Sequence, residues 1–304
     1  ILLNQNYFQH NILEAGAHYA DFPWRTANNI NNTGMPEPPP YAGDKRIFLA
    51  EQFYDTTHTI RRQLHKKYIR RCLDNFVGNN NVIQTIGEEY TGPFHFMQFW
   101  LNTVNEWEHE KKKNAIIALS ATKDVQDAVL SSPQYAAAVD IIDIRYWHYQ
   151  ADGSSYTPAG GQNLAPRQHA RLLKPKSTSF EQVYRAVSEY RKKYPKKAVM
   201  YSADGYDKYG WAVFMGGGSM ANIPVMPHAF LRDAALMKPI ADPTKNESYV
   251  LAGPPGMIIY STNPTSFSGG SQGRGIIASK FDPKTGKQVD DNEKLDAVVV
   301  WVHS

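Results

Sequence analysis

Short apolar runs recur along the first two thirds of the chain, and a longer stretch with helical periodicity follows most of them. This alternation predicts β/α units that build a parallel sheet. Runs that are almost wholly apolar, such as VDIIDI at 139–144, are typical of parallel strands buried on both faces. The predicted strands are 1–8, 82–86, 115–119, 139–144, 198–201 and 211–215.

Four stretches between these runs have the spacing of amphipathic helices, at 55–76, 94–113, 124–130 and 179–193. Ser179 or Thr178 ahead of Glu181 is a capping signal for the last of them. On the first helix we expect a buried face of Leu64, Tyr68, Cys72 and Phe76, with arginine and lysine opposite. On the second we expect a buried face of Phe96, Phe99, Trp100, Val104 and Trp107.

The order of elements predicts an α/β fold, a (β/α)8 TIM barrel followed by a small antiparallel β-sandwich. We place the barrel at 1–238 and the sandwich at 239–304, where short strands alternate with turn residues such as DPKTG. Six strand–helix steps are visible, whereas a closed barrel needs eight. Because two steps are lacking, and because the chain starts at Ile1 rather than Met, we expect one or two N-terminal strand units to be absent from this chain or to lie on another.

Two long irregular stretches, 11–44 and 150–177, follow predicted strands. Irregular stretches of this length are uncommon in compact domains and are often functional loops. In a barrel both would lie at the carboxyl ends of the strands, where active sites are built.

Composition narrows the classes of function. The net charge of +4 over 304 residues, with scattered basic positions, does not indicate nucleic acid as a partner. No apolar run approaches the length of a membrane span. The single cysteine, Cys72, excludes an intrachain disulfide and a cysteine-cage zinc site, and no GxSxG elbow points to an esterase.

The segment NVIQTIGEEYTG at 81–92 runs from an apolar strand into two adjacent carboxylates, Glu88 and Glu89. Glycosidic bond cleavage needs one acid to protonate the leaving oxygen and a second carboxylate to attack or to activate water. A glutamate at a strand end among aromatic side chains can have the raised pKa that this acid requires. The alternative interpretation is a pair of solvated charges.

Asp204, the first acid after the predicted strand at 198–201, is a candidate for the second carboxylate. Three interpretations stay open: Asp204 itself, a carboxylate from the first loop such as Glu14 or Asp21, or a site without a nucleophile. A separation of about 5–5.5 Å between Glu89 and Asp204 would predict retention, and about 6.5–9.5 Å would predict inversion.

The predicted sugar-binding residues come from two places. In a barrel strand alternate side chains share a face, so Arg145, Trp147 and Tyr149 are expected on one face and Tyr146 and His148 on the other. His148 is more often structural than functional. The first loop supplies polar and aromatic groups. Glu14 and His18 are four residues apart, as two metal ligands on a helix could be, but no convincing third ligand accompanies them. The predicted substrate-binding set is Glu14, His18, Trp24, Arg25, Glu88, Arg145, Trp147, His148 and Tyr149, with no metal and no cofactor.

Residues 81–219 resemble the bacterial retaining glycoside hydrolases of the large (β/α)8 clan, in which a segment similar to NVIYEIGNEP follows the fourth strand. The resemblance implies that Glu89 is the acid/base and that Glu88 replaces the usual Asn. It also implies that Ala203 stands where the nucleophilic Glu would be. The tail, with YVLAGPPGMIIYS and KFDPKTG, is similar to the collagen-binding-like β domain that follows barrels of uncharacterised members.

These patterns together predict a glycosidase, secreted or periplasmic, that acts in carbohydrate metabolism or polysaccharide degradation on a glycan that carries acidic groups. We expect acidic groups on the glycan because basic residues such as Arg25 and Arg145 could pair with them. The rival is a glycan-binding barrel that has lost its nucleophile, and a lyase or a structural module are further classes. The oligomeric state and the sugar stay open.

Overall fold

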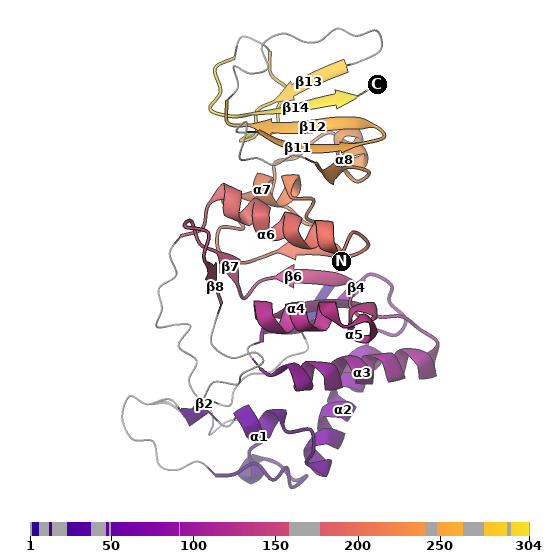
Figure 1. Ribbon diagram of the computed structural model, residues 1–304. Helices are drawn as coiled ribbons and strands as arrows, with labels where there is room; N and C mark the ends of the chain where they lie inside the picture. Colours follow the sequence, from indigo (N-terminus) through magenta and orange to yellow (C-terminus); the bar gives the residue numbers. More distant parts are fainter. Residues whose placement is uncertain are drawn as a thin grey trace. The chain divides into compact units, whose positions relative to one another are not determined.

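The computed structural model describes residues 2–5, 12–13, 23–37, 47–48, 50–90, 92–157, 177–240, 248–263, 277–290 and 293–303 (Figure 1). The chain divides into two compact units, which are described one at a time. The first unit takes in residues 1–147 and 156–175, and the second takes in 148–155 and 176–304. The fold is mixed α/β, with a parallel sheet and a separate antiparallel sheet.

The first unit contains four parallel strands, which lie side by side in the sheet in the order β1-β4-β5-β6. Leu2 lies beside Val82, Ile83 beside Ile116, and Ala118 beside Ile141. A helix follows β4 and two follow β5, because parallel neighbours need a crossover connection. The predicted β/α alternation is therefore confirmed here. The strands are β1 (Leu2–Gln5), β4 (Val82–Tyr90), β5 (Ile116–Ala121) and β6 (Ile141–Ile144).

The helices of this unit pack apolar faces inward. On α3 the predicted face is confirmed, with Phe96, Trp100, Val104 and Trp107 buried, and only Phe99 is partly exposed. The helices are α1 (Ala50–Tyr54), α2 (Thr59–Asp74), α3 (Phe94–Lys111), α4 (Lys123–Ser131) and α5 (Pro133–Ala137). The short elements are β2 (Ile12–Leu13), the 3₁₀ turn Thr26–Asn28 and β3 (Ile47–Phe48).

The predicted buried face of α2 is wrong by one position. The buried side chains are Arg61, His65, Ile69 and Leu73, while Tyr68 is 43% exposed. The two stripes have the same spacing, so periodicity alone could not separate them. Burial of a charged and a polar residue decided the register: Arg61 pairs with Asp55 at 3.1 Å, and the His65 ring bonds to the Phe53 carbonyl at 2.8 Å.

The second unit begins with β7 (His148–Tyr149) and continues from α6 (Phe180–Lys193). The Ser179 hydroxyl accepts a hydrogen bond from the Gln182 amide at 3.3 Å, so the predicted cap is confirmed. The strand β9 (Ala198–Tyr201) has the predicted bounds. Two short helices follow, α7 (Gly210–Met215) and α8 (His228–Ala234), and β8 (Ser155–Tyr156) lies at the boundary of the units.

The predicted strand at 211–215 is wrong, because these residues form α7. The amides of Ala212 and Val213 both donate to the Tyr209 carbonyl, at 2.9 and 3.2 Å. Trp211, Ala212, Val213 and Met215 are all buried, so the helix carries no polar stripe. A short apolar run is compatible with a buried strand or a buried helix, and only the tertiary packing separates the two.

The antiparallel sheet of the second unit has the strand order β10-β11-β12-β14-β13, and the four predicted strands of the tail are confirmed. Phe230 of α8 packs on this sheet, with ring centroids 5.8 Å from those of Phe281 and Trp301. The DPKTG turn is confirmed by the Asp282 carboxylate, which accepts from the Lys284 amide at 2.9 Å. The strands are β10 (Lys238–Pro239), β11 (Ser248–Gly253), β12 (Gly256–Ser261), β13 (Ile277–Phe281) and β14 (Val298–His303).

The boundary between residues 238 and 239 stays a prediction. The second compact unit contains residues from both sides of it. One hydrogen bond crosses that boundary, because the Trp211 indole donates to the Pro283 carbonyl at 2.7 Å. Within the described residues, no helix combines the length and the apolar character that a membrane crossing would need.

Candidate active site at the strand ends

A β-bulge interrupts β4 at its carboxyl end. Ile86 lies beside Leu119 of β5, but the next pair joins Tyr90 to Ala121, so β4 takes four steps where β5 takes two. Gly87 opens the bulge with φ of +70°, a conformation that favours glycine. The backbone of Glu88 and Glu89 therefore lies within the bulge, at the edge of the sheet where parallel strands end. Bulges at such places commonly re-aim side chains near active sites.

Tyr90 fixes the end of the bulge. Its ring is buried, and its hydroxyl donates to the Pro93 carbonyl at 2.7 Å. The rings of Tyr54 and Phe96 pack against it, and burial raises the pKa of Tyr90 well above its usual value. Tyr90 is thus a structural anchor. The side chains of Glu88 and Glu89 lie outside the described part of the structure.

A buried amide holds the ends of the next two strands together. The Gln126 side chain, on α4, donates to the Leu119 carbonyl of β5 at 2.9 Å and to the Asp143 carbonyl of β6 at 3.0 Å. Its oxygen accepts from the Trp147 indole at 2.9 Å. Gln126 is fully buried, so all three bonds are sheltered from water. This network gives the carboxyl edge of the sheet a fixed geometry.

Gln126, Asp143 and Thr122 are buried polar residues at this edge that were not predicted from the sequence. Thr122 caps β5, and its amide donates to the Tyr90 carbonyl at 3.2 Å. A signal existed for two of them. Gln126 interrupts the apolar face of the predicted helix 124–130, and Asp143 is an acid inside an otherwise apolar strand. A polar residue in such a position is buried with partners more often than it is exposed.

The predicted alternation of side chains over 145–149 is wrong. β6 ends at Ile144, the chain bends at Tyr146, and Trp147, His148 and Tyr149 are buried one after another. Alternation requires continuous strand geometry, which this segment does not have. Arg145 is half-buried. The Trp147 ring has no exposed area and lies 4.7 Å from the Lys123 ammonium, so here it supports the strand ends.

In the second unit, Asp204 follows the carboxyl end of β9 and is exposed. Its carboxylate accepts from the Thr178 amide at 3.4 Å, and its own carbonyl accepts from the Tyr201 hydroxyl at 2.8 Å. Ala203 before it is buried. The backbone of Asp204 is therefore held firmly, while its carboxylate has one long hydrogen bond among the residues described.

Tyr149 lies in the same unit and contacts the polar side chains of Glu189 and Arg185. Its hydroxyl donates to the Glu189 carboxylate at 2.5 Å, and the Arg185 guanidinium lies 3.9 Å from its ring centre. The Thr178 hydroxyl donates to the Tyr149 carbonyl at 2.6 Å. Thr178 thus joins the segment around Tyr149 to Asp204.

Of the substrate-binding residues predicted in the first loop, Trp24 and Arg25 are described, and both have partners within the first unit. Trp24 stacks on His65, with ring centroids 4.3 Å apart, and meets Phe53 edge-on. Arg25 pairs with Glu37 at 2.7 Å. Glu14, His18 and Asp21 lie outside the described residues. Of the described part of the chain, no three His, Cys, Asp or Glu side chains gather as a metal site would require.

His65 predicts a pH dependence of stability. Burial lowers its pKa from 6.5 to about 4, against the hydrogen bond to Phe53, which favours the charged form. Between these values the unfolded chain binds a proton that the folded chain does not. Stability is therefore fully present above pH 6.5 and falls by about 3 kcal/mol as the pH drops to 4. Urea unfolding across this range measures it, and His65→Gln is expected to remove about one proton from the slope. An unchanged slope in that variant would contradict the assignment.

The fold and the strand-end geometry define a mixed α/β protein with a bulged, carboxylate-bearing edge on its parallel sheet. The chain belongs to the family described as "Domain of unknown function (DUF6298)", whose model matches residues 1–237. No sequence among the curated proteins matches it.

The solved structures that are similar to it include two glycoside hydrolases. One is described as "Glycoside hydrolase", with 11% identity and a TM-score of 0.46, over 78% of this chain and 68% of that one. The other is a glycoside hydrolase family 5 protein from Bacteroides vulgatus ATCC 8482, with 10% identity and a TM-score of 0.43, over 78% and 66% of the two chains. Similarity at this level establishes no activity for this chain.

Proposed function

We propose that this protein hydrolyses glycosidic bonds of a polysaccharide or oligosaccharide that carries acidic groups. The bulged end of β4 carries the proposal, because the backbone of two adjacent acidic residues, Glu88 and Glu89, lies at the carboxyl edge of a parallel sheet. Active sites of β/α folds are built at this edge. The resemblance of residues 81–92 to the acid/base segment of clan members supports the same assignment.

Glu89 is the proposed general acid/base, and Asp204 the proposed second carboxylate. Glu89 is the last residue but one of β4, and Asp204 follows the carboxyl end of β9. We further propose that the parallel strands belong to a (β/α)8 barrel and that the tail is a β-sandwich. The residues that would line the glycan site are Glu14, His18, Trp24, Arg25, Glu88, Arg145, His148 and Tyr149. Trp147 would support it from beneath. Export from the cell follows from the substrate class.

The test is the release of reducing ends from neutral and acidic polysaccharides. Glu89→Gln is expected to lower release by at least about 100-fold, because the amide cannot protonate the leaving oxygen. The matched control is Glu293→Gln, the same change at an exposed carboxylate before β14, and it is expected to leave the rate unchanged. Equal release by wild type and Glu89→Gln would overturn the assignment of Glu89. An unsaturated product that absorbs in the ultraviolet would identify a lyase instead.

Ala203 favours a second candidate, a glycan-binding protein without catalysis. It is buried where the resembling enzymes carry their nucleophile. This candidate predicts saturable glycan binding with no released ends, and equal binding by wild type and Asp204→Asn. Affinity electrophoresis in gels that contain each polysaccharide separates the two: cleavage that Asp204→Asn abolishes rules out the binding protein.

A further inference from the structure

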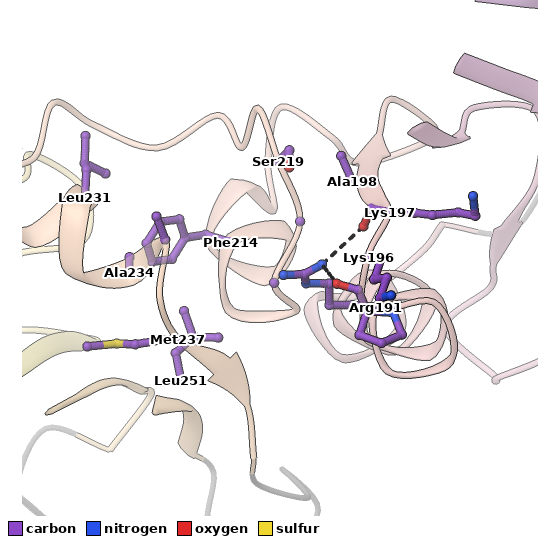
Figure 2. A pocket seen from close by; sticks show the side chains of 14 residues that line it. Arg191, Lys196, Lys197, Ala198, Phe214, Ser219, Leu231, Ala234, Met237 and Leu251 are labelled. Carbon is purple, nitrogen blue, oxygen red and sulfur yellow. Dashed lines mark hydrogen bonds between the residues drawn. The ribbon is translucent and has the colours of Figure 1, made fainter. Parts of the chain in front are cut away.

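A cavity of about 490 Å³ lies within the second unit, near the amino end of β9 (Figure 2). Its size is within the range of roughly 300–1,000 Å³ that small-molecule sites occupy. The end of α6, the start of β9, the glycine turn after α7, α8 and β11 supply its walls. Asp204 follows the opposite end of β9, so the cavity is separate from the proposed catalytic carboxylate.

Where the structure describes the lining, its charged residues are basic: Arg191, Lys196 and Lys197. The guanidinium of Arg191 uses Nη1 to donate to the carbonyls of Pro195, at 2.7 Å, and Lys197, at 3.2 Å. Among the described residues, Nε and Nη2 of Arg191 have no hydrogen-bond partner. Figure 2 shows this guanidinium directed toward the middle of the cavity. The guanidinium is therefore held in position, and its Nε and Nη2 groups can donate to an anion.

The opposite wall is apolar. Figure 2 places Phe214, Leu231, Ala234, Met237 and Leu251 together, across from Arg191. The ring of Phe214 is fixed by Phe230, which stacks on it at 5.8 Å. Leu231 is 40% exposed, so part of its apolar side chain is open to the solvent. A ligand with an apolar body would cover this wall.

The remaining features limit the ligand further. The glycine turn offers no nest for a phosphate, because the amides of Gly217, Gly218 and Ser219 donate to carbonyls of Phe214, Val213 and Val199. Among the described residues that line the cavity, Ser219 alone has an uncharged polar side chain. A sugar would leave most of its hydroxyls without partners there, which costs free energy.

We propose that this cavity binds an organic monocarboxylate on an apolar body, of the size of a phenylalkanoic or medium-chain fatty acid. The carboxylate would accept from the free donors of Arg191, and the apolar body would lie on Phe214 and Ala234. The proposal rests on contacts within the second unit and is independent of the hydrolase assignment.

The experiment is calorimetric titration of the whole chain with 4-phenylbutyrate, with 4-phenylbutyramide and glucuronate as matched probes. Saturable binding of 4-phenylbutyrate is expected. Wild type is expected to bind the amide about 10–100-fold more weakly than the acid, because the charge-assisted pair with Arg191 is lost. Arg191→Gln is expected to bind the acid more weakly than wild type by the same factor. Glucuronate is expected not to bind, since it lacks the apolar body. Lys192→Gln, the neighbouring exposed cation on α6 outside the cavity, is expected to bind as wild type does.

Arg191 also donates to two backbone carbonyls, so its replacement could disturb the local fold. A second variant therefore tests the site while Arg191 stays in place. Ala234→Phe places a ring in the cavity and is expected to abolish binding while the thermal unfolding midpoint stays close to that of wild type. Absence of saturable binding, equal affinity for the acid and the amide, or full binding by Ala234→Phe would each overturn the proposal.

Discussion

Gly87→Ala is expected to lower the free energy of unfolding by about 4 kcal/mol. A positive φ costs an L-residue about 1–2 kcal/mol, and overpacking adds about 1–3 kcal/mol. The overpacking is specific: a Cβ on Gly87 would lie 2.4 Å from the Cβ of Tyr90 and 3.1 Å from the Ser120 carbonyl. Relief requires the bulge to open, which moves the backbone of Glu88 and Glu89. Glycan hydrolysis is therefore expected to fall together with stability.

Gly78→Ala is the matched control. Its Cβ would meet no atom within 4 Å, and its backbone φ is not positive. Its expected effect on unfolding is within about 0.5 kcal/mol, as for most exposed substitutions. Urea unfolding of both variants measures the difference. Equal stability of Gly87→Ala and Gly78→Ala would show that the bulge does not need glycine.

Gln126→Leu is expected to destabilise the protein by a similar amount, about 4 kcal/mol. Leu has nearly the volume of Gln, so the loss comes from hydrogen bonds rather than from a cavity. The carbonyls of Leu119 and Asp143 and the Trp147 indole lose their bonds to Gln126 inside the protein. A buried group that loses its bond costs about 1–3 kcal/mol.

A double-mutant cycle with Trp147→Phe isolates one of these bonds. Trp147→Phe removes the indole donor, so the two changes share a loss and are expected to be less than additive by about 1 kcal/mol. Gln134→Leu, at an exposed amide on α5, serves as control and is expected to change stability by less than about 0.5 kcal/mol. Strict additivity in the cycle would mean that the Trp147–Gln126 bond contributes nothing to stability.

The strand that carries the candidate acids was predictable from the sequence, but the residues that support its end were not. Strand 82–86 and the acids after it were legible because an apolar run with an abrupt polar end is a local pattern. The bulge at Gly87 was not, since a bulge is a mismatch with a neighbouring strand, and the sequence of β4 does not contain that neighbour. Gln126 was overlooked for the same reason: its three partners come from β5, β6 and the segment after β6.

The sequence by itself determined where most strands and helices lie, because hydrophobic periodicity and capping depend on residues close in the chain. Ala198–Tyr201 and the strands of the tail are examples. The tertiary structure decided what contacts between distant segments control. It made 211–215 a buried helix, since a short apolar run suits either element. It moved the buried stripe of α2 by one residue, since Asp55 and the Phe53 carbonyl supply partners for Arg61 and His65.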